Sequence, residues 1–403
     1  MGPELEGENS KVKFTFSKRL EHFETGIFAA LDEKKQKLER SGRKIWNLSI
    51  GTPDFEPPEH VRKALVEAAA KPENYRYAIS DLPELTEAVI AYYRRRFGVN
   101  LEPEEVLAVH GSQEGIGHLG MALCNPGDVV LLPDPGYPIF EAGSFLGGAQ
   151  VAYYPLLREN SFLPDFAAIP EETARKAKYI IVSYPSNPVC AVGTPEMYRE
   201  LIRFAETYNI IVIHDNAYSD ILYDGEEGTS FLCFPGAKDV GAEFFSLSKS
   251  FNITGARISF LVGNREIVGA LRHLRSQIDF GVFLPVQYAA IAALNGPRDE
   301  VEAQRRTYEE RRNTLCGGLR SIGWDVPDSR GTMFVWAPVP KGFSSSQEFC
   351  MELVERTGVL CTPGYAFGPL GEGYVRFALV LPVQEIENLI RAIDESGILR
   401  ERP

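Results

Sequence analysis

Short apolar runs recur along the middle of the chain, and between residues 61 and 294 each alternates with an amphipathic stretch of helical period. Several runs are rich in Val, Ile and Leu without the apolar–polar alternation of a half-exposed strand. Strands of this kind lie in parallel sheets that helices cover on both faces. The sequence therefore predicts an α/β unit with a largely parallel sheet. The candidate strands are residues 106–109, 129–132, 151–154, 179–183, 210–213, 244–247 and 258–262.

The connection before the last candidate strand is unusually short. Ten residues separate Leu247 from Ile258. A helical crossover between parallel strands needs about a dozen residues or more. We therefore expect the strand 258–262 to run antiparallel to its neighbours in an otherwise parallel sheet.

The two ends of the chain have a different pattern of predicted helices and strands. A long charged helix is predicted over 301–322, and it leads away from the sheet. Further expected elements are a helix over 31–43, strands over 45–50, 334–337, 359–361 and 375–380, and helices over 347–356 and 384–396. We expect residues 16–50 and 301–403 to form a smaller α+β domain, with the large domain, residues 51–300, inserted between them. Residues 1–15 are expected to be a mobile arm.

Composition excludes several classes of partner. The 403 residues carry a formal net charge of −13, which disfavours nucleic acid and anionic membranes. No apolar run approaches transmembrane length, and the polar first residues do not form a secretory signal. Six scattered cysteines without a Cys-x-x-Cys pair indicate reduced thiols and a cytoplasmic protein. The six histidines show no ligand spacing, so no metal site is expected.

A lysine framed by hydroxyl groups follows the predicted strand 244–247. Lys249 has Ser246 and Ser248 before it, and Arg257 comes eight residues later. An isolated Ser-Lys-Ser is usually a solvated loop. With an arginine nearby, the group suits an amine that condenses with an aldehyde while its neighbours bind a phosphate.

Polar residues also follow the other predicted strands, where open α/β sheets bind ligands. Ser112 and Gln113 begin a helix after the strand 106–109 and form a natural phosphate cradle. Tyr137, in an Asp-Pro-Gly-Tyr turn, offers a flat platform for a ring. Asn187 ends another strand. Each signal alone is typical of a turn or a helix cap. Ordinary turns and caps would not be expected to place all of them in this order at the ends of strands.

Pyridoxal phosphate requires this combination of groups. Lys249 would form the Schiff base and later transfer a proton. Asp215 would pair with the ring nitrogen and keep it protonated, and Tyr218 would donate to the 3′-oxygen. Ser246 and Arg257 would complete the phosphate site with the helix start. The sequence therefore predicts pyridoxal 5′-phosphate as the cofactor.

Together these motifs resemble a known family. The motif from Ser246 to Arg257, with Asn187-Pro188, Asp215-x-x-Tyr218 and the late Arg376, resembles the fold type I pyridoxal-phosphate aminotransferases of classes I and II. The resemblance extends from about Phe16 onward. The segments 111–116 and 133–138 look most like the LL-diaminopimelate aminotransferase-like branch. Gln113 is a departure, because many members of that branch have lysine or a small hydroxyl residue there.

The resemblance implies amino-group transfer between an L-amino acid and a 2-oxo acid. LL-diaminopimelate, alanine, aspartate or aromatic amino acids would be donors, with 2-oxoglutarate or pyruvate as acceptor. Gly51, Asn187 and Arg376 would bind the substrate carboxylate. It also implies a homodimer in which Tyr77, or alternatively Tyr75, reaches the cofactor phosphate of the partner subunit. A carbon–sulfur β-lyase on the same scaffold is the alternative function.

One motif points elsewhere. Gly115, Gly117 and Gly120 spell the dinucleotide-binding fingerprint, and Asp134 follows at nearly the expected distance. In that fingerprint, however, the first glycine lies directly at the end of a strand. Here five residues intervene, so we expect these glycines to lie inside a helix, where they permit close packing.

Overall fold

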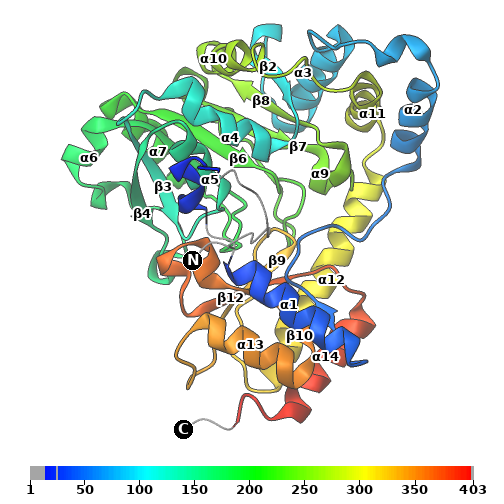
Figure 1. Cartoon of the computed structure of the whole chain (residues 1–403). Coiled ribbons are helices and arrows are strands. Elements are labelled where there is room, and N and C mark those ends of the chain that lie inside the picture. The colour runs from blue at the N-terminus through cyan, green and yellow to red at the C-terminus, as the bar shows by residue number, and fades with distance from the viewer. Residues whose placement is uncertain (1–13, 24–25, 401–403) are drawn as a thin grey trace.

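The computed structural model describes residues 14–23 and 26–400, so most of the predicted N-terminal arm lies outside the described residues. In this described part, a seven-stranded sheet has the order β2-β8-β7-β6-β5-β3-β4 (Figure 1). Its strands are β2 (Val106–Val109), β3 (Val129–Asp134), β4 (Gln150–Pro155), β5 (Ala177–Ser183), β6 (Ile211–Asn216), β7 (Gly241–Ser246) and β8 (Ser259–Gly263). Each overlaps a run predicted from the sequence, which confirms the predicted sheet.

Strand β8 is the antiparallel member of this sheet. It pairs antiparallel with both β2 and β7, whereas β3 to β7 pair in parallel with one another. Between β7 and β8 there is room for only the short helix α9 (Leu247–Ser250) and a 3₁₀ turn, Thr254–Ala256. The connection is too short for a crossover, as expected.

Helices cover both faces of the sheet, because successive residues of each buried strand point to opposite sides. On one face, Val109 and Phe244 pack with α4 (Ser112–Leu123), α5 (Ile139–Leu146) and α10 (Arg265–Arg275). On the other face lie α3 (Pro83–Phe97), α7 (Pro195–Tyr208) and α11 (Leu284–Asn295). The remaining helices of this unit are α2 (Glu59–Ala69), α6 (Glu171–Lys176) and α8 (Ala237–Val240).

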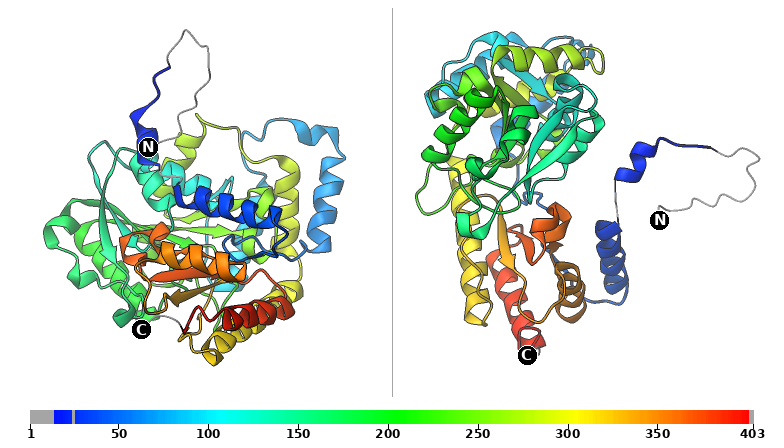
Figure 2. Two further views of the ribbon diagram at one scale, coloured as in Figure 1. Left: turned by 60° about the horizontal axis from the view of Figure 1, so that its bottom comes forward. Right: turned by 90° about the vertical axis from the view of Figure 1, so that its left-hand side faces the viewer.

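Segments from both ends of the chain form a smaller α+β unit below the large sheet in Figure 1. Strand β1 (Trp46–Asn47) pairs with β10 (Val359–Leu360), and β12 (Tyr374–Ala378) lies between β11 (Thr362–Pro363) and β9 (Phe334–Pro338). The helices are α1 (Gly26–Arg40), α12 (Asp299–Ser321), α13 (Ser346–Thr357) and α14 (Val383–Ser396). Figure 2 shows this unit from two further sides. The domain boundaries at residues 50 and 300, between the large and the small domain, stay predictions. None of the described helices is both long and apolar enough to cross a membrane.

The predicted strand over 45–50 is too long. Strand β1 ends at Asn47, whose side-chain oxygen accepts hydrogen bonds from the Ser49 backbone and hydroxyl, at 3.1 and 2.7 Å. This local turn takes Ser49 and Ile50 out of the sheet, and both line the cavity described below.

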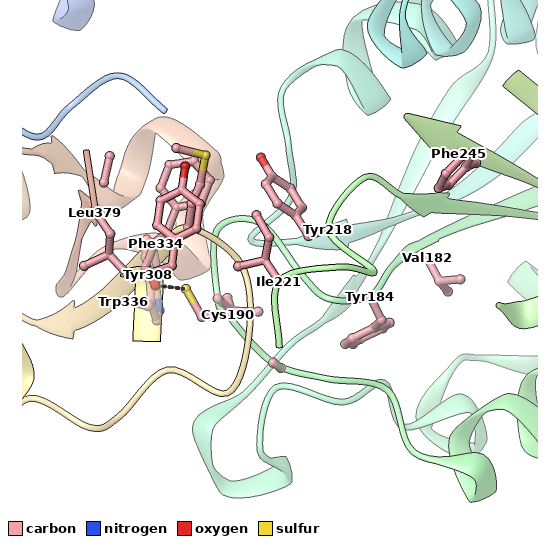
Figure 3. Close-up of a cluster of buried hydrophobic side chains, with 14 of the residues drawn as sticks. Val182, Tyr184, Cys190, Tyr218, Ile221, Phe245, Tyr308, Phe334, Trp336 and Leu379 are labelled. Carbon is pink, nitrogen blue, oxygen red and sulfur yellow. Dashed lines mark hydrogen bonds between the residues drawn. The ribbon is translucent and has the colours of Figure 1, made fainter. Parts of the chain in front are cut away.

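The two units share a continuous core (Figure 3). Phe334 and Trp336 of β9 and Tyr308 of α12 belong to the same buried cluster as Tyr184 and Ile221 of the large unit.

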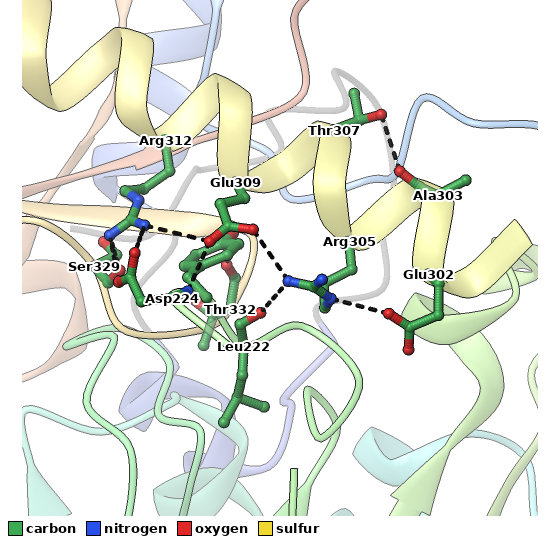
Figure 4. A network of polar contacts seen from close by, with 11 residues as sticks. Leu222, Asp224, Glu302, Ala303, Arg305, Thr307, Glu309, Arg312, Ser329 and Thr332 are labelled. Carbon is green, nitrogen blue, oxygen red and sulfur yellow. Dashed lines mark hydrogen bonds and ion pairs between the residues drawn. The ribbon is translucent and has the colours of Figure 1, made fainter. Parts of the chain in front are cut away.

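Helix α12 also ties the units together with ion pairs (Figure 4). Arg312 donates to both oxygens of Asp224, at 2.7 and 3.1 Å, and Arg305 donates to the Leu222 carbonyl. The loop after β6 is therefore fixed to the helix that leads into the small unit.

The three fingerprint glycines lie inside α4, as expected. A Cβ on Gly120 would come within 2.4 Å of the Gly143 carbonyl oxygen of α5, and one on Gly115 within 2.5 Å of the Phe244 ring. Gly115 and Gly120 therefore serve close packing, and none of the three forms a strand-to-helix turn for a dinucleotide.

We predict opposite effects for alanine at two positions of α4. Gly120→Ala should lower the free energy of unfolding by about 2 kcal/mol, because its methyl group meets backbone that cannot move aside. Gly117→Ala should be neutral or stabilise by up to about 1 kcal/mol, because its Cβ would only touch Ile139 at 3.6 Å. Urea denaturation measures both. Equal stability of the two variants would contradict the packing argument.

Candidate active site

A cavity of about 440 Å³ lies at the edge of the large sheet where β2, β3, β5, β6 and β7 end. The small unit closes its other side with Phe334 and Phe367. The predicted site residues that line it are Gly51, Ser112, Gln113, Tyr137, Asn187, Asp215, Tyr218, Ser246, Lys249, Arg257 and Arg376. The fold therefore brings every predicted site residue except Tyr77 to one place.

Lys249 extends from α9 into this cavity. Ser246 caps the helix by accepting a hydrogen bond from the Ser248 backbone, and it contacts the Ser259 hydroxyl at 2.9 Å. The Lys249 amine donates to the Gly51 carbonyl oxygen at 2.6 Å. Burial, followed by the charges of Arg376 and Arg257, lowers the pKa of Lys249 to about 8. Roughly a tenth of the amine is therefore neutral, and nucleophilic, at pH 7, far more than for an ordinary lysine.

One end of the cavity is suited to a phosphate. Gly111 precedes α4 with a φ of +87°, and a Cβ there would lie 2.1 Å from a guanidinium nitrogen of Arg257. Glycine at this position thus lets the arginine reach the start of α4. The adjacent Ser112 hydroxyl is buried and has no partner. A helix start, a guanidinium and an unpaired hydroxyl are the groups that bind a phosphate dianion.

Asp215 lies at the end of β6 with one buried carboxylate oxygen that has no partner. Burial raises the pKa of Asp215 to about 6, while His214 lowers it and Glu243 raises it. A protonated ring nitrogen would satisfy the unpaired oxygen. Tyr218 is also buried, which raises the pKa of its phenol and keeps it a neutral donor.

Tyr137 and Gln113 face each other across the cavity wall. The Tyr137 hydroxyl donates to the Gln113 side-chain oxygen at 3.2 Å. Tyr137 follows β3 and packs edge-on against Phe140. This contact gives the tyrosine ring a defined orientation beside the phosphate end of the cavity.

Arg376 forms the opposite end. It donates to the Asn187 side-chain oxygen at 2.7 Å and to the Ser49 carbonyl oxygen at 3.1 Å. Its guanidinium lies between the rings of Phe334 and Phe367, at 4.1 and 4.6 Å from their centroids. Burial lowers the pKa of Arg376 to about 10, so the side chain stays charged at neutral pH. A flat, fixed guanidinium of this kind suits a carboxylate.

The cavity therefore has an excess of positive charge. Among the described residues that line it, Lys249, Arg257 and Arg376 are basic and Asp215 alone is acidic. A ligand with two anionic ends, one at Arg257 and one at Arg376, complements this arrangement.

Several residues that shape the cavity carry no clear signal in the sequence. Phe334 and Phe367 belong to apolar stretches that look like ordinary core. Gln304 donates to the Lys249 carbonyl oxygen at 2.8 Å, and Arg311 binds both oxygens of Asp54 at 2.7 Å. Both are on α12, where polar side chains are expected to face solvent. A buried arginine there could be inferred only from the fold.

Tyr77 lies outside the cavity. Its ring is 75% exposed and rests against Phe280 with 4.8 Å between centroids. Tyr75, the alternative, is 65% exposed, and its hydroxyl donates to the Ala69 carbonyl oxygen at 2.9 Å. Within one chain, neither tyrosine contributes to the site.

A cluster behind the phosphate end has the composition of a metal site. Ligand atoms of His110, Glu114 and Asp279 lie within 4.8 Å of one another. However, the Arg275 guanidinium contacts all three, at 3.0 Å from His110 and Asp279 and 3.4 Å from Glu114. These residues therefore form an ionic network that braces the start of α4.

Comparison with known proteins gives a consistent picture. The family model for aminotransferase class I and II matches residues 43–393. An LL-diaminopimelate aminotransferase of Dehalococcoides mccartyi is 43% identical, and the match covers 92% of this chain and 96% of that protein. An LL-diaminopimelate aminotransferase of Aquifex aeolicus is also 43% identical, and the match covers 93% of this chain and 97% of that protein.

Among solved structures, substrate-bound BacF from Bacillus subtilis is 35% identical with a TM-score of 0.92, covering 96% of this chain and 99% of that one. A probable N-succinyldiaminopimelate aminotransferase from Thermus thermophilus is 37% identical with a TM-score of 0.87, covering 92% and 100%.

We predict that Lys249→Met stabilises the cofactor-free protein. The pKa of Lys249 is about 8 when folded and 10.5 as an ordinary lysine, so below pH 8 the native state holds a buried charge at a cost. The variant should be more stable by on the order of 3 kcal/mol below pH 8. The difference should shrink between pH 8 and 10.5, because the folded-state lysine is then neutral and the unfolded-state lysine is losing its proton.

Thermal denaturation between pH 7 and 10.5 measures this difference. Lys63→Met, at an exposed position on α2, is the matched control and should show no such pH dependence. A constant difference across the pH range would contradict the prediction.

Proposed function

Since the chain belongs to the class I and II aminotransferases, we propose that it transfers the amino group of LL-diaminopimelate, or a closely related amino acid, to 2-oxoglutarate. The enzyme is a pyridoxal-phosphate-dependent aminotransferase. The relatives named LL-diaminopimelate aminotransferase support the choice of donor. The observation that carries the site assignment is that Lys249 and Asp215 share one cavity between two anion-binding ends.

The residues present fit the cofactor. Ser112, Gln113, Ser246 and Arg257 would hold its phosphate, and Tyr137 would lie against the ring. Asp215 would face the ring nitrogen, because its buried oxygen has no other partner. Asn187 and Tyr218 would be donors to the 3′-oxygen. Lys249, whose amine extends into the cavity, would be the residue that attaches the cofactor.

Bound pyridoxal phosphate supplies an aldehyde for the amino group and a protonated ring that accepts the electrons left when the α-proton departs. Lys249 would take that proton from the α-carbon of the substrate and hold it for return, as an amine whose pKa is lowered to about 8 can do. Asp215 would stabilise the positive ring nitrogen electrostatically. Tyr218 stays protonated and donates a hydrogen bond.

Arg376 would bind the α-carboxylate of both substrates. Asn187 and the Ser49 carbonyl fix one edge of the guanidinium, and the aromatic rings on either side fix its plane. Gly51 lies beside this end, and a side chain there would meet the Phe334 ring at 2.4 Å. Glycine therefore allows the Phe334 ring, which contacts the Arg376 guanidinium, to lie against the backbone here.

The alternative, a carbon–sulfur β-lyase, is not favoured, because the relatives are aminotransferases. We also propose a cytoplasmic location. All six cysteines lie in the described part of the chain and form no disulfide, which agrees with a reducing compartment.

We also propose that the protein forms a homodimer. An exposed apolar surface comprises Tyr75, Tyr77, Ile79, Ile278, Phe280 and Phe283, whose exposed fractions range from 44 to 84%. Tyr75 packs against Phe283 and Tyr77 against Phe280, and exposed apolar surface of this kind suits contact with a second copy. Tyr77 would then reach the cofactor phosphate of the partner subunit.

We predict that the wild-type enzyme converts LL-diaminopimelate and 2-oxoglutarate to glutamate. Lys249→Ala should abolish this reaction and the borohydride-trapped cofactor label. Arg376→Lys should raise the KM for both substrates at least about tenfold, because a point charge replaces a bidentate partner. A coupled glutamate assay measures turnover, and peptide mapping locates the label.

Alanine, aspartate and aromatic amino acids serve as competing donors in the same assay. A label on another lysine would contradict the site. Release of pyruvate and thiol from cystathionine without amino transfer would instead support the lyase.

We predict that Phe280→Asp converts the dimer to a monomer and weakens cofactor binding, because it places a charge in the apolar surface and removes the partner's tyrosine from the site. Tyr77→Phe should stay dimeric and lose about tenfold in cofactor affinity, equivalent to one hydrogen bond to a charged group. Sedimentation velocity and cofactor titration measure these effects. Leu146→Asp, an exposed apolar position outside this surface, is the control. A dimeric Phe280→Asp protein would contradict the proposal.

A further inference from the structure

A second polar cluster lies directly behind the candidate active site, on the opposite face of the large sheet. His214 precedes Asp215 on β6, so its side chain points away from the cavity toward α3 and α7. Glu243 is its neighbour in register on the parallel strand β7. Both residues are fully buried, with exposed fractions of 0%. A histidine and a glutamate within apolar strands require compensating interactions.

Glu243 has four such interactions. One carboxylate oxygen accepts from the hydroxyls of Tyr93 and Ser230, each at 2.8 Å. The other accepts from the Phe231 backbone at 2.8 Å and contacts His214 Nδ1 at 2.7 Å. Four donors on two oxygens match the acceptor capacity of an ionised carboxylate. Glu243 is therefore buried as an anion.

His214 is in a position to balance that charge. It is the one basic side chain in hydrogen-bond contact with Glu243 in the described part of the chain. Its other ring nitrogen lies 3.3 Å from the Tyr198 hydroxyl, which can accept a second N–H. Burying a carboxylate without a cation is costly, and a protonated imidazole removes that cost.

We propose that His214 is a positioning residue whose positive charge cancels that of Glu243, so that Asp215 can stay ionised opposite the cofactor ring nitrogen. The inference rests on the role proposed for Asp215. Without the imidazolium, two carboxylates on neighbouring strands would repel each other through the sheet, and Asp215 would become protonated more easily.

The other titratable groups around Glu243 do not supply the positive charge that would balance it. Tyr93 on α3 and Tyr198 on α7 face the cluster, and burial raises the pKa of each phenol, so both are neutral. The pKa of Cys233, an exposed thiol after β6, is also raised by partial burial. Tyr137 and Tyr218 face Asp215 from the cavity side, and the basic side chains of Lys249, Arg257 and Arg376 line the same cavity. Burial raises the pKa of Asp215, His214 opposes that effect, and Glu243 adds to it.

The test is the pH dependence of the dissociation constant for pyridoxal phosphate, measured by absorbance titration of the cofactor-free protein between pH 5 and 8.5. Affinity should fall as Asp215 becomes protonated. The midpoint is the pH at which half of this change in affinity has occurred. In His214→Gln it should rise by about one pH unit, because the negative charge of Glu243 is then not balanced. In the double variant His214→Gln/Glu243→Gln it should return to the wild-type value, because both charges are gone.

Two control variants distinguish a change of charge from the loss of a hydrogen bond. Tyr93→Phe removes a hydrogen bond from the same cluster but no charge, and it should leave the midpoint in place. Asp215→Asn should lose the midpoint near pH 6, while a dependence on Lys249 near pH 8 should stay. If the midpoint near pH 6 is not lost, the role proposed for Asp215 fails, and not the role of His214 alone.

An unchanged midpoint in His214→Gln, or a double variant that behaves like the single one, would overturn the inference. Should His214→Gln not fold, ¹⁵N resonances of the wild-type imidazole decide the matter at pH 7. Protonation of both ring nitrogens supports the ion pair, and an unprotonated nitrogen refutes it.

Discussion

Three basic side chains, Lys249, Arg257 and Arg376, converge on a small cavity that contains one carboxylate among its described lining residues. Their mutual repulsion and their burial both oppose this arrangement, and Lys249 responds with a lowered pKa. The fold must therefore hold the charges in place from outside the cavity. A ligand with two anionic ends relieves the repulsion, so binding such a ligand also stabilises the folded protein.

The supports for these charges come from distant parts of the chain. Arg376 is held by aromatic rings of the small unit and by Asn187 of the large one. The backbone near Lys249 is held by Gln304 of α12. Helix α12 is in turn fixed to the loop after β6 by Arg312 and Asp224. The site therefore depends on how the small unit sits on the large one, and the continuous core between them preserves that relation.

The sequence predicts the sheet and most of the site because both follow from local patterns. Strands such as 106–109 are apolar without alternation, and polar residues such as Asp215 come directly after them. The side chains that orient these residues leave no such trace. Phe334 resembles any buried aromatic residue, and Arg311 resembles a solvated helix residue until the fold places Asp54 beside it. The strand predicted over 45–50 is too long because the turn made by the Asn47 side chain overrides the β propensity of its neighbours.

Gln113 illustrates how charge is balanced at the phosphate end. A lysine at this position would add a fourth cation to the cavity that Lys249 lines. The glutamine instead accepts a hydrogen bond from Tyr137 and adds no charge. The start of α4 and Arg257 then supply most of the attraction for a phosphate, and α4 depends on Arg275 and Glu114 behind it. With a neutral residue at position 113, burial and the charges of Arg376 and Arg257 alone lower the pKa of Lys249.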